Sequence, residues 1–223
     1  TYEVGFHDGR PFLVMEYVDG PTLGSHVRAA GGLAVADAVR LTTQIGAGLE
    51  EAHAIGIVHR DVKPGNILLH RLRAGGLLAK VVDFGLAIAL ERNTTGDGTS
   101  VVQKHDIAGS PLYMSPEQIR GEELTGASDQ YSLAVVLYEM LTGRPPFVGD
   151  SLKAIFEKHL HDAVPEMHLA TKLESAERIN AVVRKGMAKH RTERYPSIAE
   201  FVSALNEAIG GGGQDGRESV ACG

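Results

Sequence analysis

The stretch His59-Arg60-Asp61-Val62-Lys63-Pro64-Gly65-Asn66 decides how the rest of this 223-residue sequence is interpreted. It places a carboxylate, Asp61, and an amide, Asn66, on one short loop that follows a predicted helix. The carboxylate can accept a proton from a hydroxyl group, and the amide oxygen can bind a metal ion. Pro64-Gly65 sharpens the turn, so we expect both side chains to point the same way. Taken alone, an Asp with an Asn five residues later is a weak signal.

A second carboxylate follows an apolar strand, where Lys80-Val81-Val82 leads directly into Asp83-Phe84-Gly85. A carboxylate at a strand end is a natural site for Mg²⁺ that already carries phosphate ligands. Short strands are predicted at residues 67–69 and 78–82, and a hairpin between them would bring Asn66 close to Asp83. Two oxygen ligands and one base would then converge, which is the equipment that phosphoryl transfer requires.

Hydrophobic periodicity predicts a mainly α-helical domain with short β-hairpins. Residues 128–142 are apolar on nearly all sides, which indicates a helix buried in the core. Residues 35–54 repeat apolar side chains at three- and four-residue steps, which indicates an amphipathic helix. A first hairpin is expected because His7-Asp8-Gly9-Arg10 separates two partly apolar runs, residues 2–6 and 11–17. Further helices are predicted over residues 22–30, 151–160, 174–188 and 197–209, and a mobile loop over residues 91–104.

Composition and charge exclude several classes of function. The net charge of −6 is spread along the chain without a basic block, which argues against nucleic-acid binding. No apolar stretch is long enough to span a bilayer, and we expect no signal peptide. The single cysteine, Cys222, cannot form an internal disulfide, which fits a reducing compartment. A cytoplasmic location is therefore expected, either as a free protein or as the cytoplasmic part of a membrane-anchored one.

In their order along the chain, these segments resemble the signature set of protein kinases. The loop at residues 59–66 is followed by Asp-Phe-Gly at 83–85 and then by Ser-Pro-Glu at 115–117. The run from Gly109 to Gln118 is most similar to the bacterial branch of the eukaryotic-like (Hanks-type) serine/threonine kinases. The resemblance implies the helical C-lobe of a kinase, preceded by a remnant hairpin of the N-lobe sheet. The boundaries expected are residues 1–18 for the N-lobe remnant and hinge, 19–209 for the C-lobe and 210–223 for a disordered glycine-rich tail.

The resemblance also implies roles for individual residues in a reaction that uses ATP and Mg²⁺ or Mn²⁺. Asp61 is implied to orient the substrate hydroxyl and take its proton. Lys63 is implied to neutralise the transferring phosphate, and its presence favours serine and threonine in protein substrates. The metal is expected at Asn66 and Asp83. The nucleotide is expected to contact Met15, Glu16, Val18 and Leu68 in addition.

Other residues are implied to be regulatory or structural. Arg60 is expected to receive a phosphate from the activation loop, added by autophosphorylation, which self-association of two molecules would support. Ile88 stands where the family often has a basic residue, which weakens that phosphate site. The expected structural contacts are His59 beneath Phe84, Asp129 on the catalytic-loop backbone and a buried ion pair between Glu117 and Arg194. Asp129 could instead only cap its helix, and the pair could be unrelated surface charges. The regulatory hydroxyl groups expected are those of Thr94, Thr95, Thr99, Ser100 and, beside Asp61, Ser110.

Two features of the family are missing from the sequence: a glycine-rich phosphate loop and the nucleotide-binding lysine. We expect both upstream of Thr1, so that the 223-residue chain alone has no measurable activity and loses order in residues 1–12. The leading interpretation is a serine/threonine protein kinase. Alternatives are a catalytically incompetent scaffold of the pseudokinase type and, less favoured, a small-molecule phosphotransferase. The segment from Gly109 to Gln118 argues against the last class, because it forms a peptide-docking platform in the protein kinases.

Overall fold

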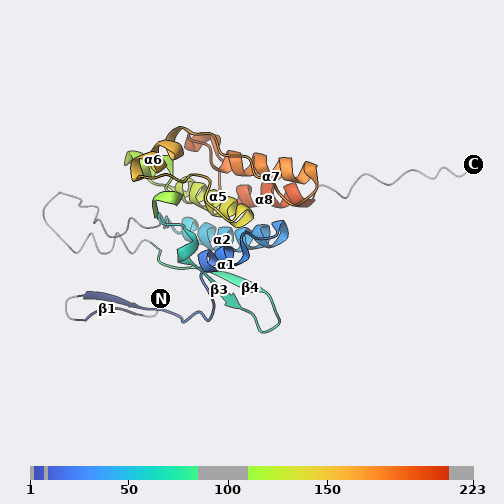
Figure 1. Ribbon diagram of the computed structural model, residues 1–223. Helices are drawn as coiled ribbons and strands as arrows, with labels where there is room; N and C mark the ends of the chain where they lie inside the picture. The colour runs from blue at the N-terminus through green and yellow to red at the C-terminus, as the bar shows by residue number, and fades with distance from the viewer. Residues whose placement is uncertain (1–2, 8–9, 85–109, 211–223) are drawn as a thin grey trace, which may run out of the picture.

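The computed structural model describes residues 3–7, 10–84 and 110–210. Helices dominate the described chain, and the strands form two separate antiparallel pairs (Figure 1). This confirms the mainly α architecture with short hairpins. Among the described residues, no helix combines the length and apolar character needed to cross a bilayer. The helices are α1 (Leu23–Ala30), α2 (Val35–Ala54), α4 (Pro116–Arg120), α5 (Gly126–Thr142), α6 (Leu152–His161), α7 (Leu173–Gly186) and α8 (Ile198–Gly210).

Helix α5 forms the centre of the core because almost every side chain from Ser128 to Met140 is buried. Helix α2 packs against both α5 and α8 (Figure 1). Gly46 allows the close contact with α8, since a Cβ atom there would lie 2.7 Å from Cγ2 of Val202. The helix predicted over residues 35–54 has the same bounds as α2, and α5 begins two residues before its predicted start.

The hairpin that follows the loop of residues 59–66 consists of β3 (Ile67–Arg71) and β4 (Leu77–Val81). Ile67 pairs with Val81, and the Val82 N–H continues the ladder by donating to the Asn66 carbonyl at 2.9 Å. β3 is longer than predicted, because two glycines with positive φ at positions 75 and 76 delay the turn. This pairing brings the end of the loop next to the start of the segment that contains Asp83.

The other hairpin, β1 (Glu3–His7) and β2 (Arg10–Val14), extends away from the helical body (Figure 1). The ring of Phe12 lies over its cross-strand partner Gly5, which has no side chain of its own. Phe12 and Val14 are 42% and 39% exposed. β2 ends at Val14, so the strand predicted to reach residue 17 is shorter than expected.

Candidate active site

The side chains of Lys63 and Asn66 meet at the Asp61 carboxylate, on the loop of residues 59–66, which we call the catalytic loop. Lys63 Nζ lies 2.6 Å from Asp61 Oδ2, and Asn66 Nδ2 donates to the same oxygen at 3.0 Å. Asn66 Nδ2 also donates to the Asp61 carbonyl at 2.9 Å. The 3₁₀ turn η1 (Pro64–Asn66) produces this geometry by folding the chain back within five residues. The carboxylate is therefore oriented from two sides and only partly buried.

Asp83 directly follows the residue whose N–H is bonded to the Asn66 carbonyl. The backbone of Asp83 has φ 64°, a left-handed conformation that is uncommon outside glycine. Its side chain is exposed, whereas Asn66 is 8% exposed. Since Asn66 directs Nδ2 at Asp61, its Oδ1 is the atom left to bind a cation. The Asp83 carboxylate and the Asn66 amide oxygen belong to two segments joined by the Val82 N–H bond, and both are of the oxygen type that Mg²⁺ prefers.

His59 attaches the catalytic loop to the end of β4. Its Nε2 lies 2.9 Å from the Val82 carbonyl, and its Nδ1 accepts a hydrogen bond from the Asp61 N–H at 3.2 Å. Both contacts fit the neutral tautomer with the proton on Nε2. The imidazole is 1% exposed and lies 4.7 Å from the Phe84 ring, between ring centroids. His59 and Phe84 are thus in the structural contact that was expected.

Asp129, on the first turn of α5, binds the backbone of the same loop. It is 1% exposed, and its carboxylate accepts hydrogen bonds from the His59 N–H and the Arg60 N–H, both at 2.8 Å. The N-cap of α5 is Thr125, so Asp129 does not serve as the cap. His53, at the end of α2, adds a third contact through Nε2 at 2.7 Å. The sequence prediction did not include His53, because no local pattern relates it to a residue 76 positions away.

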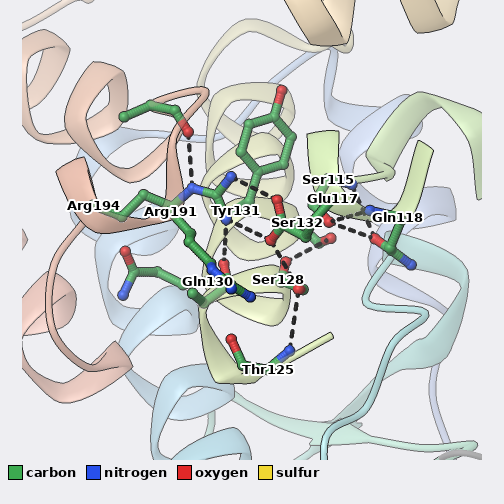
Figure 2. Close-up of polar contacts among 12 residues, drawn as sticks. Ser115, Glu117, Gln118, Thr125, Ser128, Gln130, Tyr131, Ser132, Arg191 and Arg194 are labelled. Atoms are coloured by element: carbon green, nitrogen blue, oxygen red, sulfur yellow. Dashed lines mark hydrogen bonds and ion pairs between the residues drawn. The ribbon is translucent and has the colours of Figure 1, made fainter. Parts of the chain in front are cut away.

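Glu117 and Arg194 form the expected buried ion pair, which joins α4 to the chain before α8 (Figure 2). Ser128 Oγ donates to Glu117 Oε1 at 2.8 Å, and Arg194 Nη1 donates to the Ala127 carbonyl at 2.8 Å. Burial by itself would raise the pKa of the Glu117 carboxyl. The hydrogen bonds and positive charge of Arg194, together with the Ser128 hydrogen bond, outweigh burial, so the net pKa lies below its ordinary value. Glu117 is therefore ionised in the fold.

Of the residues expected around the nucleotide, Met15, Glu16 and Val18 follow β2, and Leu68 lies within β3. Glu16 forms an ion pair with Lys80, and Lys80 is the register partner of Leu68 in the hairpin. Lys80 lowers the pKa of the exposed Glu16 carboxyl. Val18 is buried, whereas Met15 is 38% exposed. The ion pair therefore links the segment after β2 to the strand that leads to Asp83, a contact that the sequence did not predict.

A model of the family described as "Protein kinase domain" matches residues 2–205. The chain belongs to this family. Serine/threonine-protein kinase PknB of Mycolicibacterium smegmatis is 42% identical over 196 residues, which are 87% of this chain and 30% of that protein. Probable PknB kinases of Bifidobacterium longum and Lactococcus lactis are 38% and 37% identical over 94% and 90% of the chain, or 29% and 30% of the relatives. The chain thus spans about three-tenths of the length of these relatives.

Within the kinase domain, the proposed regulatory residues are described only in part. Thr94, Thr95, Thr99 and Ser100 lie outside the described residues, and Ser110 begins the 3₁₀ turn η2 (Ser110–Tyr113). Arg60 is exposed and has φ 70°. A regulatory role for these hydroxyl groups through Arg60 or Asp61 therefore stays a prediction.

A small hollow of the kinase domain opens beside Asp61. It is lined by the loop residues Arg60, Asp61 and Val62 and by residues that follow in the chain after position 110. The second group includes Gln118 of α4, a helix that was not predicted. Its signal was present, since Ser115 and Gln118 form a capping box, with serine three residues before glutamine. The remaining lining residues are Tyr113, Met114 and Ser132.

Proposed function

We propose that the protein containing this chain transfers the γ-phosphoryl group of ATP to serine or threonine hydroxyl groups of proteins. The observation that carries the proposal is the Asp61 carboxylate held by Lys63 and Asn66, on a loop whose end pairs with the residue before Asp83. Membership in the protein kinase family and similarity to PknB kinases support the same reaction. Residues 19–209 are the proposed C-lobe.

In the proposed reaction, Asp61 orients the attacking hydroxyl group and accepts its proton. Its position at the edge of the hollow allows a substrate side chain to approach the carboxylate. Lys63 lies close enough to Asp61 to place its positive charge beside the transferring phosphoryl group. The transfer then forms a bond between the hydroxyl oxygen and phosphorus while the bond from phosphorus to the ADP oxygen breaks.

Asn66 and Asp83 are the proposed ligands of Mg²⁺, which when bound neutralises the developing charge on the phosphate oxygens. The chain's own contribution is to hold these two residues in place. The Val82 N–H bond to the Asn66 carbonyl sets the spacing of the two backbones, and the imidazole of His59 fixes the Val82 carbonyl. The adenine of ATP is proposed to lie against Leu68 and the segment from Met15 to Val18.

Activation by a phosphate on the segment between Asp83 and Glu117 is proposed to act through Arg60. A phosphoryl group there would carry roughly −1.5 to −2 charge and could pair with this exposed guanidinium. Two molecules that phosphorylate each other are the proposed route. The setting proposed for the reaction is the cytoplasm, where the single cysteine stays reduced.

The test compares phosphotransfer from ATP to a serine/threonine peptide by the full-length protein and by its Asp61→Asn variant. We expect the variant to lose transfer while its melting temperature stays that of the wild type. Asp37→Asn is the matched control, because Asp37 is an exposed carboxylate on α2 that pairs only locally with Arg40. Full activity of Asp61→Asn contradicts the mechanism. A wild type that binds ATP without transfer favours the scaffold, and transfer only to small molecules favours the other phosphotransferase class.

A further inference from the structure

Gln118 uses the two ends of its side-chain amide for two different purposes. Its Oε1 accepts hydrogen bonds from the Ser115 N–H at 2.9 Å and from Ser115 Oγ at 3.1 Å (Figure 2). Its Nε2 donates to the Arg60 carbonyl at 2.6 Å. The partners determine the orientation of the amide, since a backbone N–H must meet an oxygen and a carbonyl must meet an N–H. One end therefore completes the start of α4, and the other reaches the catalytic loop.

The Arg60 carbonyl belongs to the peptide unit that joins Arg60 to Asp61. The other polar group of that unit, the Asp61 N–H, donates to His59 Nδ1 at 3.2 Å. Both polar groups of the peptide unit are thus bonded to side chains. Arg60 itself is in a left-handed conformation, with φ 70°, and the Arg60 N–H donates a hydrogen bond to the Asp129 carboxylate. Such a conformation outside glycine persists only where its surroundings hold it.

The surroundings come from two separate helices. Asp129 on α5 bonds the N–H of Arg60, and Gln118 on α4 bonds its carbonyl. Tyr113 and Met114, which line the hollow beside Asp61, directly precede Ser115, the N-cap of α4. A hydrogen bond from α4 to this carbonyl therefore connects the wall of the hollow to the backbone that carries the Asp61 carboxylate.

We propose that Gln118 is a positioning residue for phosphoryl transfer. Its side chain sets the plane of the peptide between Arg60 and Asp61 and so aims the Asp61 carboxylate at the hydroxyl group that enters the hollow. The inference rests on the proposed function for its kinetic consequence. The hydrogen bond itself, and the order that it gives to the loop, do not depend on catalysis.

The variant Gln118→Glu separates the two purposes of the side chain. A glutamate still offers an oxygen to the Ser115 N–H and hydroxyl, so α4 keeps its capping box. It has no N–H for the Arg60 carbonyl and places a second oxygen against it. Gln44→Glu is the matched control, because Gln44 Oε1 accepts from the Ala79 N–H at 2.7 Å and its Nε2 points to the Leu77 carbonyl at 3.4 Å. That site lies between α2 and β4, and its glutamine has no part in the proposed chemistry.

Two measurements on the full-length protein test the proposal. Steady-state kinetics of Gln118→Glu should show kcat reduced about tenfold with KM for ATP unchanged, the size expected for the loss of one hydrogen bond. Hydrogen–deuterium exchange should become faster in the peptide that covers residues 57–66 and stay unchanged in α5 and α8. Gln44→Glu should match the wild type in kcat and in exchange of that peptide.

Each outcome decides a different statement. Wild-type kcat and wild-type loop exchange in Gln118→Glu overturn the positioning role. Faster exchange in α5 and α8 as well would also overturn it, because the residue would then be a general determinant of stability. If the wild-type protein transfers no phosphate, the proposed function fails, and unchanged loop exchange in the variant would still refute the hydrogen-bond role of Gln118.

Discussion

Arg194 and Glu117, 77 positions apart in the sequence, are joined by two parallel hydrogen bonds in the core of the domain. Nη1 lies 2.7 Å from Oε1 and Nη2 lies 2.9 Å from Oε2 (Figure 2). The two side chains are 0% and 3% exposed. Glu117 lies on α4, whose Gln118 lines the hollow beside Asp61, so this pair attaches one wall of the hollow to the segment that precedes α8.

Glu117→Gln is expected to destabilise the domain by about 3–5 kcal/mol, because it leaves the buried guanidinium of Arg194 without a compensating charge. Urea unfolding followed by circular dichroism gives the free energy of unfolding. Asp37→Asn breaks an exposed pair with Arg40 on α2 and should cost less than about 1 kcal/mol. An equal loss of unfolding free energy in the two variants would show that the buried pair stabilises the domain no more than the exposed pair does.

The stability of the domain is expected to fall as the pH drops from about 6.5 towards 4. His159 of α6 is 0% exposed, and Tyr131 OH lies 2.9 Å from its Nδ1. Burial, and next the charge of Lys189, lower the pKa of His159 from 6.5 to about 4. Because the folded pKa lies below the unfolded one, the unfolded chain binds the proton first, and the stabilisation present above pH 6.5 is lost on acidification. The difference between pH 7 and pH 5 should be about 2 kcal/mol.

Urea titrations at pH 7, 6 and 5 measure this slope. His159→Gln should reduce it, since glutamine has no proton to take up in this range. His161→Gln makes the same change on the same helix at an exposed side chain and should leave the slope as it is. A slope that is unaffected by the change at position 159 would assign the acid sensitivity to other groups.

Two helix-terminating glycines should differ in their tolerance of a methyl group. Gly31 ends α1 with φ 68°, and Gly143 ends α5 with φ 76°. A Cβ atom at Gly143 would lie 2.6 Å from the Gly31 carbonyl oxygen, whereas one at Gly31 would meet nothing within 4 Å. Gly31→Ala should cost about 1 kcal/mol, the strain of a left-handed residue.

Gly143→Ala should cost about 3 kcal/mol, because backbone atoms cannot move aside as a flexible side chain can. Thermal unfolding of both variants under one set of conditions measures the difference. If the two melting temperatures fell equally, backbone conformation alone would account for both effects and the close approach of the two helix ends would be irrelevant.

The helices that could be predicted are those whose signal is local. α2 alternates apolar and polar side chains at helical spacing, and α5 is apolar on nearly every side, so each pattern shows both the element and its burial. α4 was missed because five residues are too few for a periodic pattern, although its capping box was visible. The order of the motifs was enough to indicate the family and the residues at the proposed reaction centre.

Local patterns in the sequence were therefore enough to predict the long helices, the buried helix α5 and the short motifs proposed to carry the chemistry, since these depend on neighbours a few positions apart. The tertiary structure added contacts that no motif predicted: His53 on Asp129, Gln118 on the Arg60 carbonyl, and Lys80 on Glu16. Each joins residues tens of positions apart. Such partners follow from how the helices and the hairpin pack in three dimensions, and no spacing in the chain encodes that arrangement.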